Sequence, residues 1–212
     1  WVELLLLETS IVSALLTLRN AIPARSRRLL LNDGARLRLL LRGGPAAARW
    51  CALLLLSAAG LRGERPRAWD PAWIEQATAL PDGSLDDVGG CLAAYYWALD
   101  RGDAAQARAF LDRALAAQQA LPEPVRQGIL VEGAYLAARH DGDPQAARAL
   151  LAQADRLAGL PDRAARLRAE AALLLAEGAG EQAREKAQAA LAAPRGGVQA
   201  EEDWLRKVVE GG

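Results

Sequence analysis

The sequence predicts an all-α protein in which N-terminal transmembrane or interfacial helices are followed by a solenoid of stacked helical hairpins. Three observations support this fold class. An apolar run of about bilayer-spanning length opens the chain, a glycine-centred pattern recurs three times, and no run of alternating β-branched residues occurs. With 212 residues and 52% hydrophobic content, the chain is long enough to bury a core.

The formal net charge is zero, but it is unevenly divided along the chain. Residues 1–66 carry ten Arg and four acidic residues, whereas residues 67–212 carry sixteen Lys or Arg and twenty-two acidic residues. In the basic part, arginines flank leucines rather than base-stacking aromatics, which favours an anionic membrane surface over nucleic acid. We therefore expect a membrane partner and no nucleic acid. The sequence has no Met and begins with Trp1, so we expect the natural start upstream.

The apolar run over residues 1–22 is predicted to be a helix that crosses the bilayer. Glu3 and Glu8 interrupt it, but charged groups near one end of a span can reach the interface. A basic cluster follows, as expected for a cytoplasmic flank: Arg19, Arg25, Arg27 and Arg28. The alternative is a buried helix of a soluble protein, in which residues 1–62 fold onto the repeats as additional hairpins.

Two shorter helices and a linker are expected next. Leucines and arginines share residues 34–42, which suits a helix lying on a membrane surface. After the break at Gly43-Gly44-Pro45, residues 46–61 form an apolar helix that is short for a span and either lies against the membrane or packs under the next helices. Residues 63–71 predict a linker, in which Asp70 caps a helix that starts at Pro71.

Three segments align without gaps, beginning at Arg101, Asp141 and Glu177. Each has Gly at its second position, Ala five residues later, Arg at the next position, and a further Ala twelve residues after the Gly. The aligned positions are Gly102, Gly142 and Gly178; Ala107, Ala147 and Ala183; Arg108, Arg148 and Arg184; and Ala114, Ala154 and Ala190. Glycine allows the left-handed turn between antiparallel helices, and alanine allows them to approach closely.

This pattern predicts helical hairpins that stack into a solenoid resembling tetratricopeptide repeats (TPRs), with Trp204 and Leu205 on a closing helix. Coincidental alignment in an alanine-rich sequence is the alternative interpretation. The expected organisation has membrane-associated helices over residues 1–62, a linker and first helix over residues 63–83, and the TPR-like domain over residues 84–212.

Most residues of chemical interest have a structural interpretation. Cys51 and Cys91 are expected to be reduced, buried thiols, because neither metal-ligand spacing nor a disulfide framework surrounds them. His140, at a helix end, is expected on the surface as an imidazolium that meets the helix dipole. Packing is expected for the aromatic residues Tyr95, Tyr96, Trp97 and Tyr135, and a solvated surface for Asp82, Asp86, Asp87, Glu201, Glu202 and Asp203.

Asp33 is the candidate site residue, because it lies between two leucine-rich runs and directly precedes Gly34. On local evidence, an Asp before Gly at a helix start is a turn residue or an N-cap. The wider context, Asn20-Ala21-Ile22-Pro23 followed by Asn32-Asp33-Gly34, resembles the site-2 protease family of intramembrane zinc metallopeptidases.

In that family, two histidines of a His-Glu-x-x-His helix and the Asp of a later Asp-Gly motif bind zinc. The resemblance implies that Asp33 is a metal ligand and that Asn20 is a catalytic residue that positions the substrate or the reacting carbonyl. Three such ligands leave zinc a fourth position for water, which the metal acidifies while a Glu accepts its proton. The chain lacks His-Glu-x-x-His, so we expect zinc, and activity, only in the complete protein.

Two functions follow as expectations, and whether the protein is an enzyme stays open between them. The first is the C-terminal part of a bacterial membrane zinc metallopeptidase, with a cytoplasmic TPR-like domain that binds a protein or peptide partner or regulates access. The alternative is a non-enzymatic, membrane-tethered TPR-like adaptor in which Asp33 only caps a helix.

Overall fold

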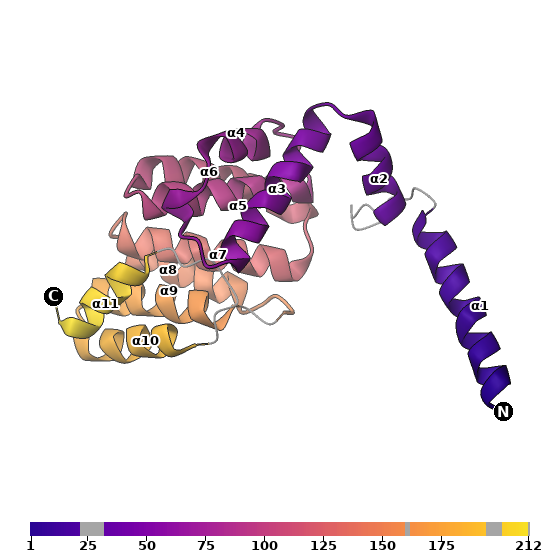
Figure 1. Ribbon diagram of the computed structural model, residues 1–212. Coiled ribbons are helices and arrows are strands. Elements are labelled where there is room, and N and C mark those ends of the chain that lie inside the picture. The colour runs from indigo at the N-terminus through magenta and orange to yellow at the C-terminus, as the bar shows by residue number, and fades with distance from the viewer. Residues whose placement is uncertain (22–31, 160–161, 194–200, 212) are drawn as a thin grey trace. The chain divides into compact units, whose positions relative to one another are not determined.

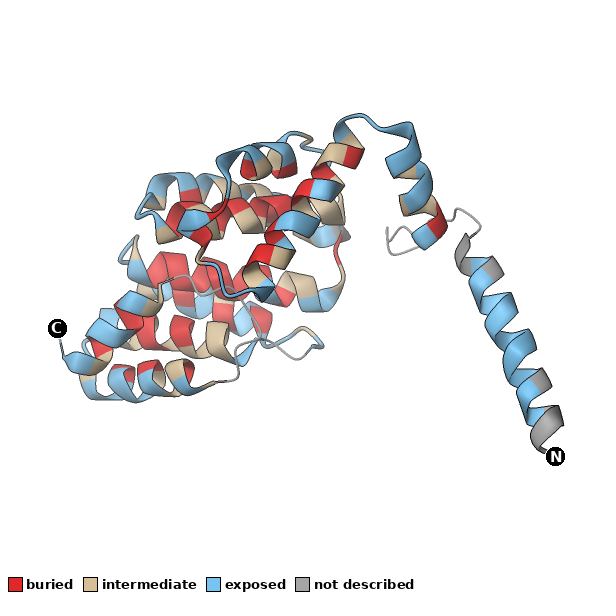
Figure 2. Cartoon of the chain, viewed as in Figure 1, coloured by how far each residue is buried: buried red, intermediate tan, exposed pale blue. Residues whose placement is uncertain are grey.

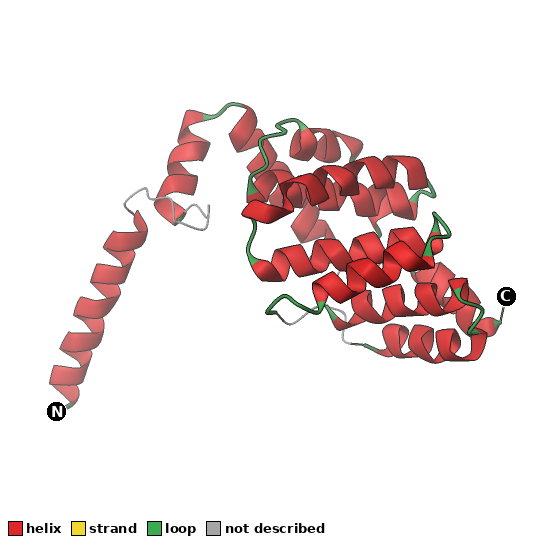
Figure 3. Cartoon of the chain, turned by 180° about the vertical axis from the view of Figure 1, so that it is seen from behind, coloured by secondary structure: helices red, strands yellow, loops and turns green. Residues whose placement is uncertain are grey.

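The computed structural model describes residues 1–21, 32–159, 162–193 and 201–211, and these residues are almost entirely helical, without a strand (Figures 1 and 3). The predicted all-α class is therefore confirmed. The chain divides into two compact units, Trp1–Ala48 and Arg49–Gly212. The predicted organisation, with a boundary after residue 62, stays a prediction. Helix α3 packs with the elements that follow it through Ala52, Leu56 and Ala59.

The first unit contains α1 (Val2–Ala21), α2 (Asp33–Arg42) and the start of α3 (Pro45–Leu61). As predicted, α2 ends at a glycine pair, where Gly43 and Gly44 have φ of +68° and +87°. Much of α1 is exposed (Figure 2). Its exposed residues include six large apolar ones, which are 51–62% exposed: Leu5, Leu6, Ile11, Val12, Leu15 and Leu16.

Length and apolar composition do not single out a bilayer span among the described helices. No one helix meets both requirements, whereas α2 and α3 meet them as a pair that bends by 118° at its break. The assignment of residues 1–22 as a transmembrane helix stays a prediction.

The second unit begins with the rest of α3, a short 3-10 helix, η1 (Pro66–Ala68), and α4 (Pro71–Thr78). Residues 63–71 are more than a linker, because Pro66 and Trp69 are buried and the Trp69 ring packs with the buried face of α3. The predicted cap of α4 is confirmed: the Asp70 carboxylate accepts a hydrogen bond from the Ala72 N–H at 2.9 Å.

Three successive helical hairpins and a closing helix form the rest of this unit (Figure 1). The helices pair as α5 with α6, α7 with α8, and α9 with α10, while α11 packs on α10. Their bounds are α5 Leu85–Asp100, α6 Ala104–Ala117, α7 Glu123–Arg139, α8 Pro144–Ala154, α9 Arg163–Ala176, α10 Gly180–Ala192 and α11 Glu202–Glu210, with a second 3-10 turn, η2 (Gln118–Ala120), after α6.

The aligned glycines and alanines have the predicted structural roles. Gly102, Gly142 and Gly178 follow the first helix of each hairpin with φ of +80°, +65° and +80°, a conformation that a side chain disfavours. All six aligned alanines are buried: five are completely buried, and Ala190 is 6% exposed. Small side chains at these positions let the two helices of a hairpin pack closely.

The aligned arginines also have a shared role, which the sequence pattern alone did not indicate. Arg108 of α6 pairs with Asp141, at the turn of the next hairpin, and Arg148 of α8 pairs with Glu177, at the following turn, at 2.7 Å. Two of the three repeated arginines therefore join one hairpin to the next.

Trp204 and Leu205 lie on a helix, α11, as predicted, and both are buried there. The Trp204 ring lies edge-on to Tyr135 of α7, with 5.6 Å between the ring centroids. Aromatic pairs favour this geometry because the positive ring edge meets the negative ring face.

Candidate functional site

Asp33 is the first residue of α2, and its side chain is exposed. The N-cap is the preceding Asn32, whose side-chain oxygen accepts from the Ala35 N–H at 3.0 Å. The interpretation of Asp33 as the cap was therefore wrong by one residue, because Asn32 has the extended backbone that an N-cap needs, with φ −75° and ψ 173°. In the first turn, the Asp33 carboxylate still lies at the positive end of the helix dipole.

Asn32 also connects α2 to the end of α1, because its Nδ2 donates to the carbonyl oxygen of Arg19 at 3.4 Å. Asn20 lies next to that contact in the last turn of α1, but its side chain is outside the described part of the structure. Ile22 and Pro23 of the same motif also lie outside the described residues. The roles of Asn20 and Asp33 in catalysis and zinc binding therefore stay predictions.

Among the described residues, no three or more His, Cys, Asp or Glu side chains are grouped so that they would hold a metal ion. Asp33 supplies one carboxylate, and a catalytic zinc ion needs three protein ligands. The single histidine, His140, ends α7 in the second unit.

A buried polar group, the Glu132 cluster, connects the first helices of the three hairpins. It consists of Glu132 on α7, Tyr95 and Tyr96 on α5, Arg168 on α9 and Tyr135 on α7. Both tyrosine hydroxyls of α5 donate to the Glu132 carboxylate at 2.9 Å, and Arg168 forms an ion pair with it. The two charged side chains are only 3% and 5% exposed.

Burial and the surrounding charges keep the tyrosines and the arginine of the Glu132 cluster protonated. Burial, reinforced by the Glu132 charge, raises the pKa of Tyr95 and Tyr96 well above the usual value, so both stay hydroxyl donors. Burial disfavours the charged form of Arg168, but the charge of Glu132 more than compensates for this effect. The pKa of Arg168 is therefore raised. Both carboxylate oxygens accept hydrogen bonds, so the cluster joins α5, α7 and α9 through side-chain contacts.

Tyr135 extends the Glu132 cluster toward α11. Its hydroxyl donates to Glu201 at 2.9 Å, and the Arg168 guanidinium carbon lies 4.4 Å from its ring centroid, within the range of a cation–π contact. The expectation that the tyrosines pack in the core is confirmed. Their hydrogen bonds to acidic side chains were not predicted.

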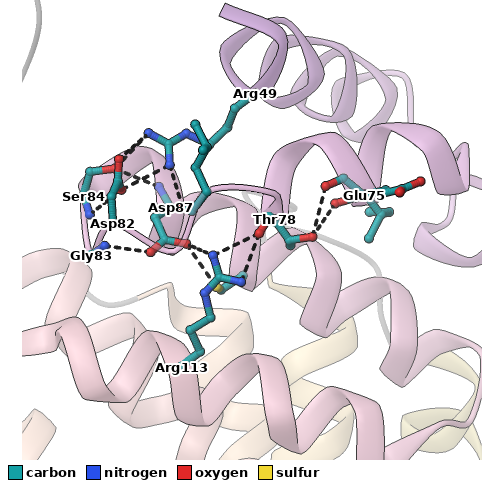
Figure 4. Close-up of polar contacts among 11 residues, drawn as sticks. Arg49, Glu75, Thr78, Asp82, Gly83, Ser84, Asp87 and Arg113 are labelled. Atoms are coloured by element: carbon teal, nitrogen blue, oxygen red, sulfur yellow. Dashed lines mark hydrogen bonds and ion pairs between the residues drawn. The ribbon is translucent and has the colours of Figure 1, made fainter. Parts of the chain in front are cut away.

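A second polar group surrounds the start of α5 (Figure 4). Arg49 of α3, which is 5% exposed, donates to both oxygens of Asp82 at 3.1 and 3.0 Å and to the Leu80 carbonyl oxygen at 2.9 Å. Partial burial opposes the charge of Asp82, but hydrogen bonds from Arg49 and Ser84 dominate and lower its pKa to about 2. This arrangement joins α3 to the segment that begins the first hairpin.

Asp87 continues this second group, and its burial corrects an expectation. Predicted as solvated surface, it is 2% exposed and ion-paired with Arg113 of α6, and it accepts from the Gly83 N–H at 2.8 Å. Arg113 also donates to the Thr78 carbonyl oxygen at 3.0 Å, as Figure 4 shows. An acid in the first turn of a helix is buried here because a cation from the neighbouring helix compensates its charge.

The two cysteines differ in their environments. Cys91 is buried as predicted, and burial raises the pKa of its thiol to about 12. Cys51 was also predicted to be buried, but it is exposed. The difference arises because α3 packs through the face that carries Ala52, Leu56 and Ala59, whereas Cys51 lies on another face of that helix.

His140 corrects a further expectation. It is the residue at the end of α7, as predicted, but it is half-buried, and its ring lies edge-on to Tyr135. Burial lowers its pKa, and the nearby cations Arg139 and Arg108 act in the same direction against the opposing effect of Glu201. The neutral imidazole, rather than the expected imidazolium, is the form that this position favours.

We expect the free energy of unfolding to fall as the pH decreases from about 7.5 to about 5.5, because the unfolded chain then binds a proton on His140 more readily than the folded chain does. This loss of stability begins as the pH falls to about 6.5, the pKa of His140 in the unfolded chain. It continues until the pH reaches the lower pKa of His140 in the folded chain. Urea titrations of the wild type and His140→Gln measure this effect. An equal pH dependence in the variant would rule out His140 as its source.

The Glu132 cluster was missed by sequence reasoning, although a signal for it exists. Glu132 is a lone acid inside an apolar stretch of α7, with Val131 before it and Gly133-Ala134 after it. A lone acid among leucines is the same signal that drew attention to Asp33. Applied to α7, it indicates a buried acid, but it does not identify Arg168 as the partner of that acid.

Comparisons of the chain with protein-family models, with curated proteins and with solved structures find no match.

Proposed function

We propose that this chain is the C-terminal part of a membrane-attached protein whose helical hairpins form a TPR-like solenoid and bind a protein or peptide partner. The proposal depends most on α1. Its six large apolar side chains are each more than half exposed, and at 100° per residue they lie on several sides of the helix. A bilayer would remove this surface from water, a gain on the order of 5 kcal/mol if half of each side chain becomes buried.

The second unit supports the binding part of the proposal. Its hairpins repeat the same turn glycines and buried alanines, and Arg108 and Arg148 join each hairpin to the next. Stacked hairpins offer an extended surface to a partner. The buried ion pair between Glu132 and Arg168 lies inside the fold and joins two hairpins. The basic segment after α1 favours a cytoplasmic position for this unit.

In its more specific form, the proposal makes the complete protein a zinc metallopeptidase that resembles the site-2 proteases. Asp33 would be one zinc ligand, Asn20 would position the reacting carbonyl, and upstream residues would supply the two histidines. The exposure of the Asp33 carboxylate supports this form, because a zinc ligand must be free to meet groups from another helix. The bound zinc would acidify a water molecule for peptide hydrolysis.

The second candidate is the membrane-tethered adaptor without catalytic activity. The observation that favours it is that Asn32 has a structural role of its own: it caps α2 and contacts the end of α1. This role is enough to explain the polar Asn32-Asp33 pair at the start of α2. Asp33 would then contribute a favourable helix-dipole interaction of about 0.3–1 kcal/mol.

Asp33→Ala in the protein expressed from its complete reading frame distinguishes the two candidates. If the protein is a metallopeptidase, the variant should lose bound zinc, measured by elemental analysis, and cleavage of a membrane-embedded substrate. Asp86→Ala is the matched control, because Asp86 is also a first-turn acid, on α5. Unchanged zinc content and cleavage in Asp33→Ala would contradict the ligand role, and absence of zinc from the wild type would favour the adaptor.

A further inference from the structure

Helix α11 contacts more of the second unit than the last hairpin. It packs along α10 (Figure 1), and its Trp204 ring lies edge-on to Tyr135 of α7. The guanidinium carbon of Arg139, the last residue of α7, lies 5.3 Å from the Trp204 ring centroid, within the range of a cation–π contact. The Tyr135 hydroxyl donates to Glu201, which directly precedes α11. The start of α11 is therefore held by the carboxyl-terminal half of α7.

A further contact joins α11 to the beginning of the second unit. Arg65, which directly precedes η1, donates to the Asp203 carboxylate at 2.6 Å. The same guanidinium donates to Asp100, the last residue of α5, at 2.5 Å. The end of α5 and the first turn of α11 therefore share one arginine. A helix that only covered α10 would not need the contacts with α7 and Arg65, so these contacts indicate a docking surface built from several elements.

Docking stabilises α11 in a conformation that this segment would not keep alone. The helix has nine residues, and a helix shorter than about 12 residues is marginal in water. Glu201, at the N-cap position, has φ of +63°, which a side chain disfavours, and its carboxylate accepts from Tyr135 instead of capping the helix. The apolar side chains of α11, Trp204, Leu205 and Val208, are all buried. Helix formation and docking are therefore coupled, as they are for a peptide that folds on a partner surface.

We propose that α11 occupies, within its own chain, the surface at which the hairpins bind a partner, and that the partner is an amphipathic helical peptide of the same chemistry. That chemistry is two acids, an aromatic residue and two apolar residues, in the pattern of Glu201, Asp203, Trp204, Leu205 and Val208. A helix that docks through its apolar face is a common mode of peptide recognition. The inference rests on the proposed partner binding and adds the class of partner and its regulation, because the partner must displace a helix that has the advantage of a high effective concentration.

Binding of the α11 sequence as a separate peptide tests this inference. The probe is a fluorescein-labelled peptide of residues 201–211, and fluorescence anisotropy measures its binding to the full chain. In Trp204→Ala, the chain's own helix loses its aromatic anchor, so we expect this variant to bind the probe at least ten times more tightly than the wild type does. Asp203→Arg should have the same effect, because it sets a second cation against Arg65 at an exposed position where the fold tolerates substitution.

Two controls make the result specific. Glu210→Arg reverses a charge at an exposed position in the last turn of α11, so this variant should bind the probe as weakly as the wild type does. A probe in which alanine replaces Trp204 should bind none of the chains. Far-UV circular dichroism shows whether each variant keeps its helices. If Trp204→Ala loses them, Asp203→Arg decides the outcome, and a loss in both variants would overturn the inference because the fold would then require α11.

The outcomes separate this inference from the proposed function. If a folded Asp203→Arg chain bound the probe no more tightly than the wild type does, the inference would be overturned, because α11 would be a fixed part of the fold. A random peptide library displayed on phage and selected against the same variant tests partner binding itself. Selected peptides that bind the wild type and the variant equally would place the partner surface elsewhere, which overturns the inference and leaves the proposed partner binding intact. If neither the probe nor any library peptide binds, both proposals are wrong.

Discussion

Glu132→Gln is expected to lower the free energy of unfolding by about 3–5 kcal/mol, the usual loss when one partner of a buried ion pair is removed. The substitution preserves shape but leaves the Arg168 guanidinium without its counter-charge at a site where that side chain is 5% exposed. It also weakens two hydrogen bonds from tyrosine hydroxyls. Chemical denaturation followed by far-UV circular dichroism measures the change.

A double-mutant cycle tests whether the loss comes from the pair itself. Glu132→Gln combined with Arg168→Met removes both charges, and we expect the double variant to be more stable than the sum of the single effects predicts. Arg148→Gln is the control, because its ion pair with Glu177 involves a side chain that is 58% exposed and contributes at most about 1 kcal/mol. A loss in Glu132→Gln no larger than in this control would contradict a stabilising role for the Glu132 cluster.

The turns and caps of the second unit could be predicted because their signals are local. A glycine with positive φ after a helix, as at Gly102 and Gly142, has a backbone requirement that few other residues meet. The role of Asp70 as the N-cap of α4 can likewise be predicted from the adjacent Pro71. The same local reasoning placed the cap of α2 one residue late, because Asn32 and Asp33 are both good N-caps and only the backbone decides between them.

The buried ion pairs could not be predicted in the same way, because each depends on which helices pack together. Glu132 and Arg168 are 36 residues apart, and no short-range spacing distinguishes this pair from the many exposed acids and arginines. Asp87 was expected in solvent for the same reason, since its first-turn position is normal for an exposed acid. Its burial follows from the position of Arg113 on the neighbouring helix.

The candidate site of the first unit was predicted by resemblance, and local geometry bears on only part of it. The structure shows how Asn32 joins the start of α2 to the end of α1. In the family that the motif resembles, the Asp ligand lies apart in sequence from the two histidines, so an Asp-Gly motif specifies only one of the three ligands. The zinc-ligand role of Asp33 therefore stays a prediction.

Gly89 and Gly90 of α5 offer a test of close packing, because substitution by alanine should change the stability of the fold in opposite directions at these two adjacent positions. A Cβ added at Gly90 would lie 2.2 Å from the Ala77 carbonyl oxygen, a backbone atom of α4 that cannot rotate away. A Cβ added at Gly89 would make an ordinary contact, 3.7 Å from Leu53 Cδ2. The two glycines therefore have different reasons to be present in one helix.

We expect Gly90→Ala to destabilise the fold by about 1–3 kcal/mol, because relieving the overlap separates α4 from α5. Gly89→Ala should instead stabilise it by up to about 1 kcal/mol, since alanine has the higher helix propensity and nothing obstructs its methyl group. Thermal and urea unfolding of both variants measure these changes. If Gly90→Ala were as stable as Gly89→Ala, α4 would not be held tightly against α5. The inference that a closely packed junction between α4 and α5 fixes the start of the hairpin stack would then be wrong.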